Sequence, residues 1–360
     1  MTQKPVTPQI GRRGFLRKAG LFGASIPVLG GAVAAACSSD DDNAQQNGNG
    51  NASENGDDNG DNGRPGYQQM DDHHRKGVEL FFENQENPIT SGQGNVPLEY
   101  RMEDGVKVFD LTVDEFEWEV TPDRTEIARG YNQMLPGPVI RVTEGDNVRI
   151  NVTNNLPDES TAVHWHGLVL PFEMDGVPYL TQDPITPGET FVYEFPIRNT
   201  GTHMYHSHHN ALDQVNRGLL GAFIVDPADP ADYPEYDHEF IVVLNDSSHG
   251  FTINGKGFPA TEAYFVKRGD RVIFRFMNEG LMHHPMHLHG MPMEVFARDG
   301  YPMNPPQKMD NLDIAPGSRF DALVEPTEPG VWAFHCHVLS HAEGSDGMHG
   351  MVSALVVEDD

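Results

Sequence analysis

The chain has 360 residues, with 54 acidic and 24 basic side chains, so its formal net charge is −30. A chain this acidic repels the phosphates of nucleic acids and of anionic membrane surfaces, which argues against those partners. Only two cysteines are present, Cys37 and Cys336, so a disulfide-stapled mini-protein is excluded. The length suffices for two domains of ordinary size, each with its own core.

The first 36 residues have the features of an export signal. They contain five basic residues and no acidic ones, and RRGFLR (12–17) resembles the twin-arginine motif. The apolar stretch that follows, 21–36, is too short for a membrane span. A cut after AAA (34–36) would leave Cys37 at the new N-terminus, as in a lipoprotein. We therefore expect a twin-arginine-type signal peptide over 1–36 and export to the periplasm or the outer face of the cell membrane, with or without a lipid anchor at Cys37.

The next segment is a predicted tether. Residues 37–69 are rich in Asn, Gly and Asp and contain almost no apolar side chains, so they cannot bury a core. We expect a disordered acidic linker there. The stretch 70–86 is compatible with a short helix, on which His73 and His74 are expected to face the solvent.

From about residue 98 the sequence contains the same unit twice. A Gly-Asp turn and an alternating apolar strand occur at 145–152 and again at 269–276. The glycine that opens each unit precedes a His-x-His pair by 19 residues at His164 and by 18 residues at His287. Matched spacing of this kind indicates a duplicated β-sandwich domain, and short strands between turns favour an all-β fold.

The expected domain limits follow from the repeat and from composition. The first β-sandwich is predicted over 88–228 and the second over 237–360. A run rich in Pro and Asp, 226–236, is expected to link them.

Each half of the repeat carries two His-x-His pairs. They are His164 and His166, His206 and His208, His287 and His289, and His335 and His337. Because side chains alternate between the two faces of a strand, both imidazoles of a pair point to one face. Neutral imidazoles in such numbers, at equivalent places in two repeats, suit copper, zinc or iron.

The last pair encloses a cysteine. Cys336 stands between His335 and His337 and must point to the opposite face of the strand, so it belongs to a second site. Its candidate partners are His284 and His341. Two histidines, one cysteine and a distant methionine form the trigonal blue-copper site. An electron that enters beside Cys336 would have a short covalent route to the histidines on either side.

Two methionines are available for the axial position of that site, Met348 and Met351, and spacing alone does not choose between them.

The motifs HWHG (164–167), HSH (206–208), HPMHLHG (284–290) and HCHVLSH (335–341) resemble those of multicopper oxidases, the laccase-like family with cupredoxin domains. The match covers roughly 139–357. It implies two cupredoxin-like Greek-key β-sandwich domains. Since Ser207 replaces the cysteine in the first domain, the pattern resembles two-domain laccases with type 1 copper in the second domain only. Those enzymes are homotrimers whose trinuclear clusters lie between domain one of one chain and domain two of the next.

The resemblance also implies four coppers per chain: one type 1, one type 2 and two type 3. The type 2 copper maps to His164 and His287. The type 3 pair maps to His166, His206, His208, His289, His335 and His337. The type 1 copper maps to His284, Cys336, His341 and a methionine. The GMHG step (347–350) resembles the family's axial segment and favours Met348, with Met351 as the alternative. Asp175 resembles the acid that assists proton delivery to oxygen.

The function expected from the sequence is that of an exported multicopper oxidase. It would take single electrons from a small reducing substrate, a phenol or a metal ion, at the type 1 copper and reduce O2 to water at the trinuclear cluster. Copper-containing nitrite reductase is an alternative. That enzyme uses a single catalytic copper with three histidines, and the eight histidines in four pairs argue against it. A non-catalytic envelope protein for copper binding or tolerance is another, but storage needs no cysteine between the two sites. No motif identifies the donor.

Overall fold

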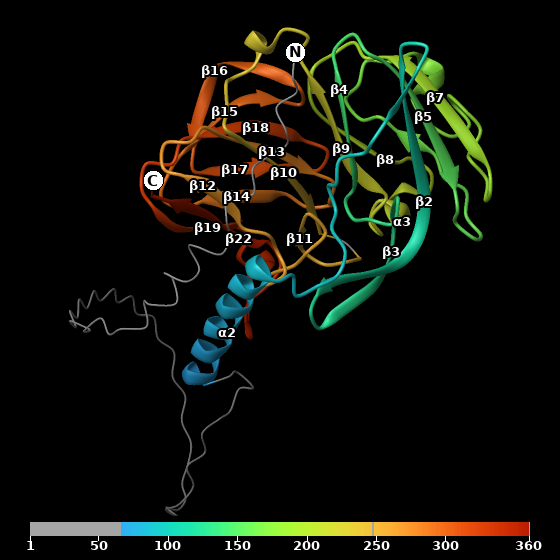
Figure 1. The fold of residues 1–360 in the computed structure, drawn as a ribbon. Coiled ribbons are helices and arrows are strands. Elements are labelled where there is room, and N and C mark those ends of the chain that lie inside the picture. Colours follow the sequence, from blue (N-terminus) through green and yellow to red (C-terminus); the bar gives the residue numbers. More distant parts are fainter. Residues whose placement is uncertain (1–65, 247, 360) are drawn as a thin grey trace, which may run out of the picture.

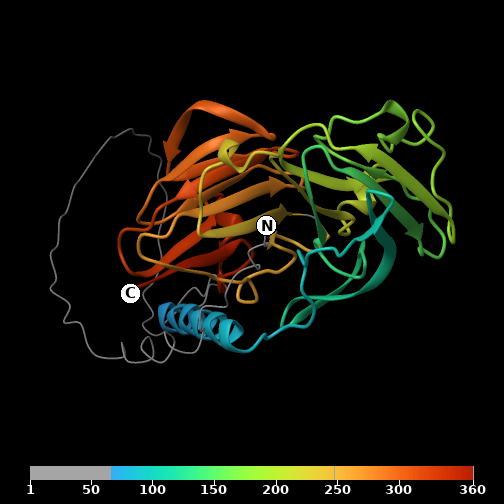
Figure 2. The same cartoon turned by 45° about the horizontal axis from the view of Figure 1, so that its top comes forward.

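The computed structural model describes residues 66–246 and 248–359. Two β-rich bodies lie side by side, the first in green shades and the second in orange and red (Figure 1, Figure 2). The predicted signal peptide over 1–36, Cys37 and the linker up to residue 65 lie outside the described residues. Within the described ranges, no helix is long and apolar enough to cross a membrane.

The first body is a sandwich of two sheets. Its strands are β1 (Arg101–Glu103), β2 (Val106–Thr121), β3 (Arg124–Tyr131), β4 (Gly137–Thr143), β5 (Asn147–Asn154), β6 (Val163–His164), β7 (Thr190–Pro196), β8 (Gly201–Ser207) and β9 (Leu220–Asp226). One sheet has the order β1-β2-β5-β7, with β3 paired to β2, and the other has the order β4-β9-β8-β6.

The second body is built in the same way. Its strands are β10 (His238–Asn245), β11 (Thr252–Ile253), β12 (Tyr264–Lys267), β13 (Val272–Asn278), β14 (His284–Leu288), β15 (Met293–Arg298), β16 (Tyr301–Met309), β17 (Asn311–Ile314), β18 (Arg319–Val324), β19 (Gly330–Cys336), β20 (Glu343–Gly344), β21 (Gly347–Met348) and β22 (Val352–Glu358). Its two large sheets have the orders β11-β10-β13-β18-β15-β16 and β12-β22-β19-β14-β17.

The pairings repeat between the two bodies. β2 lies parallel to β5 as β10 lies parallel to β13, and β4 lies parallel to β9 as β12 lies parallel to β22. The antiparallel series β6-β8-β9 recurs as β14-β19-β22. The predicted all-β duplication is therefore confirmed, whereas the limits 88–228 and 237–360 remain predictions.

Alternating apolar residues explain why these segments form sandwiches. In β5, Val148, Ile150 and Val152 are fully buried and alternate with more exposed polar residues. Trp165 lies in the core of the first sandwich and Phe334 in that of the second. Each large apolar side chain buried in this way contributes roughly 1.5–3 kcal/mol of transfer free energy.

A buried charge network joins the two sandwiches. Arg275 on β13 is 2 % exposed, and its guanidinium donates to Glu239 Oε1 at 2.6 Å and to Thr202 Oγ1 of the first sandwich at 2.8 Å. Arg141, on β4 of the first sandwich, also donates to Glu239. Burial by itself would raise the pKa of Glu239, but the positive charges of Arg275 and Arg141 outweigh burial and lower it to about 2.

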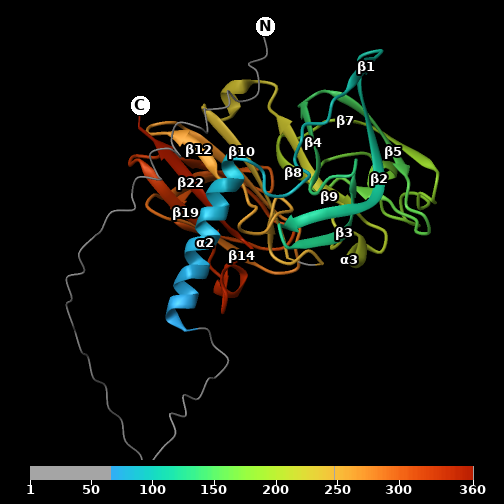
Figure 3. The same ribbon diagram turned by 60° about the horizontal axis from the view of Figure 1, so that its bottom comes forward.

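Among the described residues, one helix is long and the others are single turns. They are η1 (Phe172–Met174), α3 (Ala211–Gln214), η2 (Pro230–Asp232) and η3 (Leu339–His341). The long helix is α2 (Tyr67–Glu86), which packs against the second sandwich (Figure 3). It begins three residues before the expected stretch 70–86. His73 is exposed as predicted, whereas His74 is half-buried and lies 3.6 Å from Glu343.

We expect Glu239→Gln to lower the free energy of unfolding at pH 7 by about 3 kcal/mol, because it leaves the buried guanidinium of Arg275 and the partly exposed one of Arg141 without their shared carboxylate. Because the folded-state pKa is lowered, the stabilisation by Glu239 is present above about pH 4.5 and is lost as the pH falls toward 2. Urea unfolding at several pH values measures both effects. An unchanged free energy of unfolding at pH 7 would contradict this prediction.

Candidate metal centres

One buried group of ligands combines sulfur and imidazole, and we call it the cysteine site: His284, Cys336 and His341. Their ligand atoms lie within 4.8 Å of one another, and all three residues are buried. Cys336 Sγ is 3.5 Å from His341 Nδ1 and 3.8 Å from His284 Nδ1. His284 and Cys336 come from the paired strands β14 and β19, and His341 ends the turn η3. The predicted meeting of these three residues is therefore seen in the structure.

Two further side chains orient the imidazoles of the cysteine site. The Nε2 of His284 is in close contact with Asp246 Oδ2, 3.0 Å away, and both side chains are fully buried. The ring of Phe251 stacks on His341 with centroids 4.0 Å apart. These contacts leave the Nδ1 atoms facing Cys336. Burial raises the pKa of the Cys336 thiol to about 11, so a metal that binds here must displace its proton.

The two candidate axial methionines lie in different surroundings. Met351 is fully buried in the same core cluster as Cys336, whose backbone N–H donates to Met351 O at 3.0 Å. The N–H of Met351 donates in turn to His341 O at 2.9 Å. Met348 is half-buried and packs against a separate cluster that includes Phe258 and Phe81 of α2.

Four imidazoles of the first sandwich gather at the ends of β6 and β8, and we call them the first histidine set: His164, His166, His206 and His208. Their ring centroids lie 5.4–6.4 Å apart in the pairs that touch. His166 Nδ1 is 3.3 Å from His206 Nε2. Burial lowers the pKa of His166 to about 3 and that of His206 to about 4, so both rings are neutral and can act as ligands.

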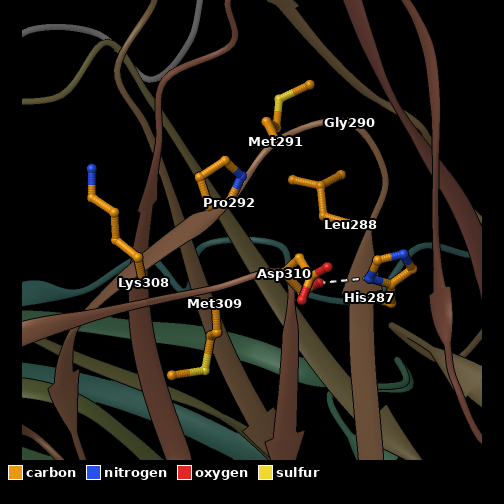
Figure 4. Close-up of a pocket in the computed structure, with 8 residues that line it drawn as sticks. All are labelled: His287, Leu288, Gly290, Met291, Pro292, Lys308, Met309 and Asp310. Atoms are coloured by element: carbon orange, nitrogen blue, oxygen red, sulfur yellow. Dashed lines mark hydrogen bonds between the residues drawn. The ribbon is translucent and has the colours of Figure 1, made fainter.

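The second sandwich presents an equivalent group, the second histidine set: His287, His289, His335 and His337. Ring centroids within it are 4.7–5.8 Å apart. His289 Nε2 lies 3.1 Å from His335 Nε2. Figure 4 shows His287 beside a surface pocket, with its ring joined to Asp310 by a hydrogen bond.

The two sets hold their rings by the same backbone contacts. His164 Nδ1 is 2.8 Å from the carbonyl oxygen of Asp175, and His287 Nδ1 is 2.8 Å from that of Asp310. His206 and His335 each place Nδ1 beside the carbonyl of the next residue, at 2.9 and 3.0 Å. A carbonyl at Nδ1 selects the tautomer that leaves Nε2 free to bind a metal.

The two sets do not meet within one chain. Among the described residues, every ring contact between these eight histidines stays inside its own set. Both sets also reach the surface, because His208, His289 and His337 are exposed. Each chain therefore presents two open groups of four imidazoles.

The middle residues of the pairs face away from the histidines. Cys336 is fully buried, whereas His335 is half-buried and His337 is exposed, which is the alternation that a strand imposes. In the first sandwich, Ser207 is also buried, but its hydroxyl donates to Gln214 Oε1 at 2.6 Å. The serine is thus part of a closed hydrogen-bond network.

Asp175 lies beside the first histidine set. Its carbonyl accepts from His164, and its carboxylate Oδ1 is 3.5 Å from His164 Nδ1 while remaining 38 % exposed. The proton-delivery role expected of it remains a prediction.

Asp246 and Phe251 were not found by sequence reasoning. Asp246 follows directly after β10 and Phe251 lies in a loop, and neither belongs to a histidine motif. The only signal in the sequence was an aspartate directly after an apolar strand, and that position does not indicate which residue the aspartate contacts.

Two family models match the chain, and both are described as multicopper oxidase. One covers residues 112–230 and the other residues 234–360. The two segments correspond to the two sandwiches.

Among solved structures, the chain is similar to the blue copper oxidase from Nitrosomonas europaea, with 32 % identity and a TM-score of 0.66. That alignment covers 69 % of this chain and 85 % of the other. The multicopper oxidase mgLAC is 34 % identical, also with a TM-score of 0.66, and the alignment covers 70 % of this chain and 86 % of that one.

Curated relatives include copper resistance protein A of Pseudomonas syringae pv. tomato, with 31 % identity over 63 % of this chain and 47 % of the relative. Laccase-2 of Botryotinia fuckeliana is 32 % identical over 66 % of this chain and 48 % of its own length. The chain spans about half the length of these curated relatives. The paired sandwiches, the buried His-Cys-His site and these matches together show that the chain belongs to the multicopper oxidase family.

Proposed function

We propose that this protein is a laccase-like oxidase that takes single electrons from a small reducing substrate and passes them to O2, which is reduced to water. The observation that carries the proposal is the position of Cys336. Its side chain lies in the buried cysteine site, while His335 and His337, its neighbours in the chain, belong to a second ligand group. An electron-transfer enzyme needs two sites that are covalently linked, whereas a storage protein does not need such a link.

The donor atoms fit copper at each site. Two imidazoles and one thiol suit a type 1 copper at the cysteine site, and the eight imidazoles of the two sets suit one type 2 and two type 3 coppers. His164 and His287 would hold the type 2 copper, as the family resemblance implies, and in each of them a backbone carbonyl at Nδ1 leaves Nε2 free to bind. The other six histidines would hold the type 3 pair. When bound, the coppers would supply the one-electron acceptor and the site of O2 reduction.

The chain's own residues prepare these sites. Asp246 and Phe251 restrain the imidazoles of His284 and His341, so that little reorganisation is needed when the metal changes charge. The Asp175 carboxylate is exposed and 3.5 Å from His164, a position from which it can collect protons from solvent for delivery to oxygen.

For the axial ligand of the cysteine site we propose Met351 in place of Met348, the residue that sequence resemblance favoured. Burial of Met351 beside Cys336 and its backbone bonds to both Cys336 and His341 support this choice. Met348 packs toward Phe258 and α2.

We further propose that the two histidine sets join between chains of a homotrimer. Each set is open at the surface, and no ring contact links the two within the described chain. On the segment around Asp175, whose carbonyl contacts His164, the side chains of Phe172, Tyr179 and Leu180 are between 66 and 77 % exposed. An exposed apolar group of this kind favours a protein contact, and a second copy of the chain would bring its second histidine set to the first.

The electron donor is proposed to be a phenol or a metal ion. Laccases and copper resistance protein A are both among the relatives, so a role in copper tolerance is a second candidate that uses the same sites. Export by the twin-arginine route, with or without a lipid anchor at Cys37, is supported by RRGFLR (12–17) and by the segment 34–37.

We expect the copper-loaded protein to bind four coppers per chain, to show the intense blue absorption of a thiolate–copper bond and to consume O2 with a phenolic donor. Cys336→Ser should abolish the blue band and lower the rate of donor oxidation at least a hundredfold, since the sulfur ligand is lost. Copper analysis, visible spectroscopy and an oxygen electrode measure these quantities.

His283→Ala is the matched control, because His283 is next to His284 but is exposed and paired with Asp313. Unchanged O2 uptake in Cys336→Ser would contradict the oxidase proposal. Nitric oxide production from nitrite without O2 uptake would favour a nitrite reductase instead.

We expect Met351→Leu to shift the blue band and raise the reduction potential of the type 1 copper, because a weak thioether ligand is replaced by an alkyl group. Met348→Leu should leave both quantities unchanged. Redox titration of the two variants decides between the methionines, and the reverse pattern would restore Met348 as the ligand.

A mixing experiment tests the intersubunit site. A chain with His166→Ala and His208→Ala lacks a first set, and a chain with His289→Ala and His337→Ala lacks a second. Each should be inactive alone, whereas co-expressed mixed oligomers should recover part of the activity, because intact sets meet at some interfaces. Native mass measurement should give a trimer. A fully active monomer, or mixed trimers without activity, would refute the shared cluster.

A further inference from the structure

Helix α2 lies outside both segments that match the family models, yet it packs against the second sandwich (Figure 3). Phe81 is 4 % exposed, and its ring stacks on that of Phe258 with centroids 5.5 Å apart and an interplanar angle of 25°. The contact belongs to a buried cluster that also contains Ala342 and Val352. These two residues border the segment between His341 and β22.

Two buried amides attach the end of α2 to the loop 258–263. Asn84 Nδ2 donates to Ala260 O and to Thr261 O, at 3.1 Å in each case. Gln85 Nε2 donates to Thr261 O at 3.1 Å, and Gln85 Oε1 accepts from the N–H of Ala263 at 2.9 Å. Both amide side chains are almost fully buried, and the loop supplies most of their hydrogen-bond partners, beside Phe81 O for Gln85 and the N–H of Ile89 for Asn84.

The close approach of the helix depends on a glycine in its interior. A Cβ placed on Gly77 would lie 3.0 Å from Cε1 of Phe258, whose ring is already packed on Phe81. Glycine is unfavourable inside a helix, so its presence at this position has a packing reason.

The loop 258–263 is hydrogen-bonded to the segment that leads into β22. The N–H of Phe258 donates to Gly350 O at 2.8 Å, and Thr261 Oγ1 donates to Val352 O at 2.6 Å. Gly350 and Val352 flank Met351, whose backbone bonds to both Cys336 and His341. A continuous series of contacts therefore runs from α2 to two ligands of the cysteine site.

A second contact reaches the other side of the same segment. The β20–β21 hairpin lies against the first half of α2, where His74 Nε2 is 3.6 Å from Glu343 Oε1. A Cβ added at Gly347 would be 3.7 Å from the Cβ of His73. The helix thus holds the segment 342–352 near both of its ends.

We propose that α2 is a positioning element of the cysteine site. By holding the loop 258–263 and the hairpin, it fixes the segment between His341 and β22, and with it the placement of His341 and Met351 relative to Cys336. The proposal rests on the proposed function only in that a copper bound at this site serves as a reporter.

The experiment compares two variants of the full chain with a matched control. Gly77→Val places a branched side chain against Phe258, and the double variant Asn84→Ala with Gln85→Ala removes the amide bonds. Val78→Ala is the control, because Val78 is on the same helix and 38 % exposed. Hydrogen exchange of the metal-free protein is measured over α2, 258–263 and 342–352. Visible and EPR spectra and the reduction potential are measured on the copper-loaded protein.

We expect hydrogen exchange to be at least tenfold faster in all three segments of both variants. The type 1 absorption band and reduction potential of both variants should be shifted. Val78→Ala should behave like the unsubstituted chain in every measurement. The proposal would be overturned if α2 exchanged faster while exchange over 342–352 and the visible spectrum stayed unchanged. It would also be overturned if α2 stayed fully protected from exchange in both variants. A missing blue band in the unsubstituted chain would contradict the proposed function instead, and the exchange data would still decide the role of α2.

Discussion

A β-strand sends neighbouring side chains to opposite faces, and the arrangement of both metal centres depends on this constraint at the end of β19. Cys336 enters the buried core of the second sandwich, while His335 and His337 turn toward the surface. One tripeptide therefore contributes to two sites with different ligands. The sulfur-containing site and the imidazole-only site are therefore only one residue apart along the chain.

Burial gives these two kinds of site different properties. At the cysteine site, the ligands are enclosed, and Asp246 and Phe251 restrict the imidazoles. A site of this kind changes little in geometry when an electron arrives or leaves. The histidine sets are open, and backbone carbonyls at Nδ1 orient four of their rings. These sets can therefore be reached from the solvent.

The duplicated fold uses the same scaffold for different purposes. Ser207 occupies the place in the first sandwich that Cys336 occupies in the second, but it bonds to Gln214. The buried contacts of Arg275 with Glu239 and Thr202 then join the two sandwiches within the chain. Because the sandwiches are joined in this way, the two histidine sets keep a defined separation within the chain.

Local periodicity was sufficient to predict the repeat, the all-β fold, the four His-x-His pairs and the opposite direction of Cys336, because strand geometry depends on adjacent residues. The meeting of His284, Cys336 and His341 could also be predicted, since all three lie in recognisable motifs. The contact of Asp246 with His284, the different burial of Met348 and Met351, and the docking of α2 depend on residues far apart in the chain. Only tertiary packing decides such contacts, because no short-range pattern states which loop or helix will cover a given strand. The separation of the two histidine sets is also decided by tertiary packing, since it follows from how one sandwich is placed against the other.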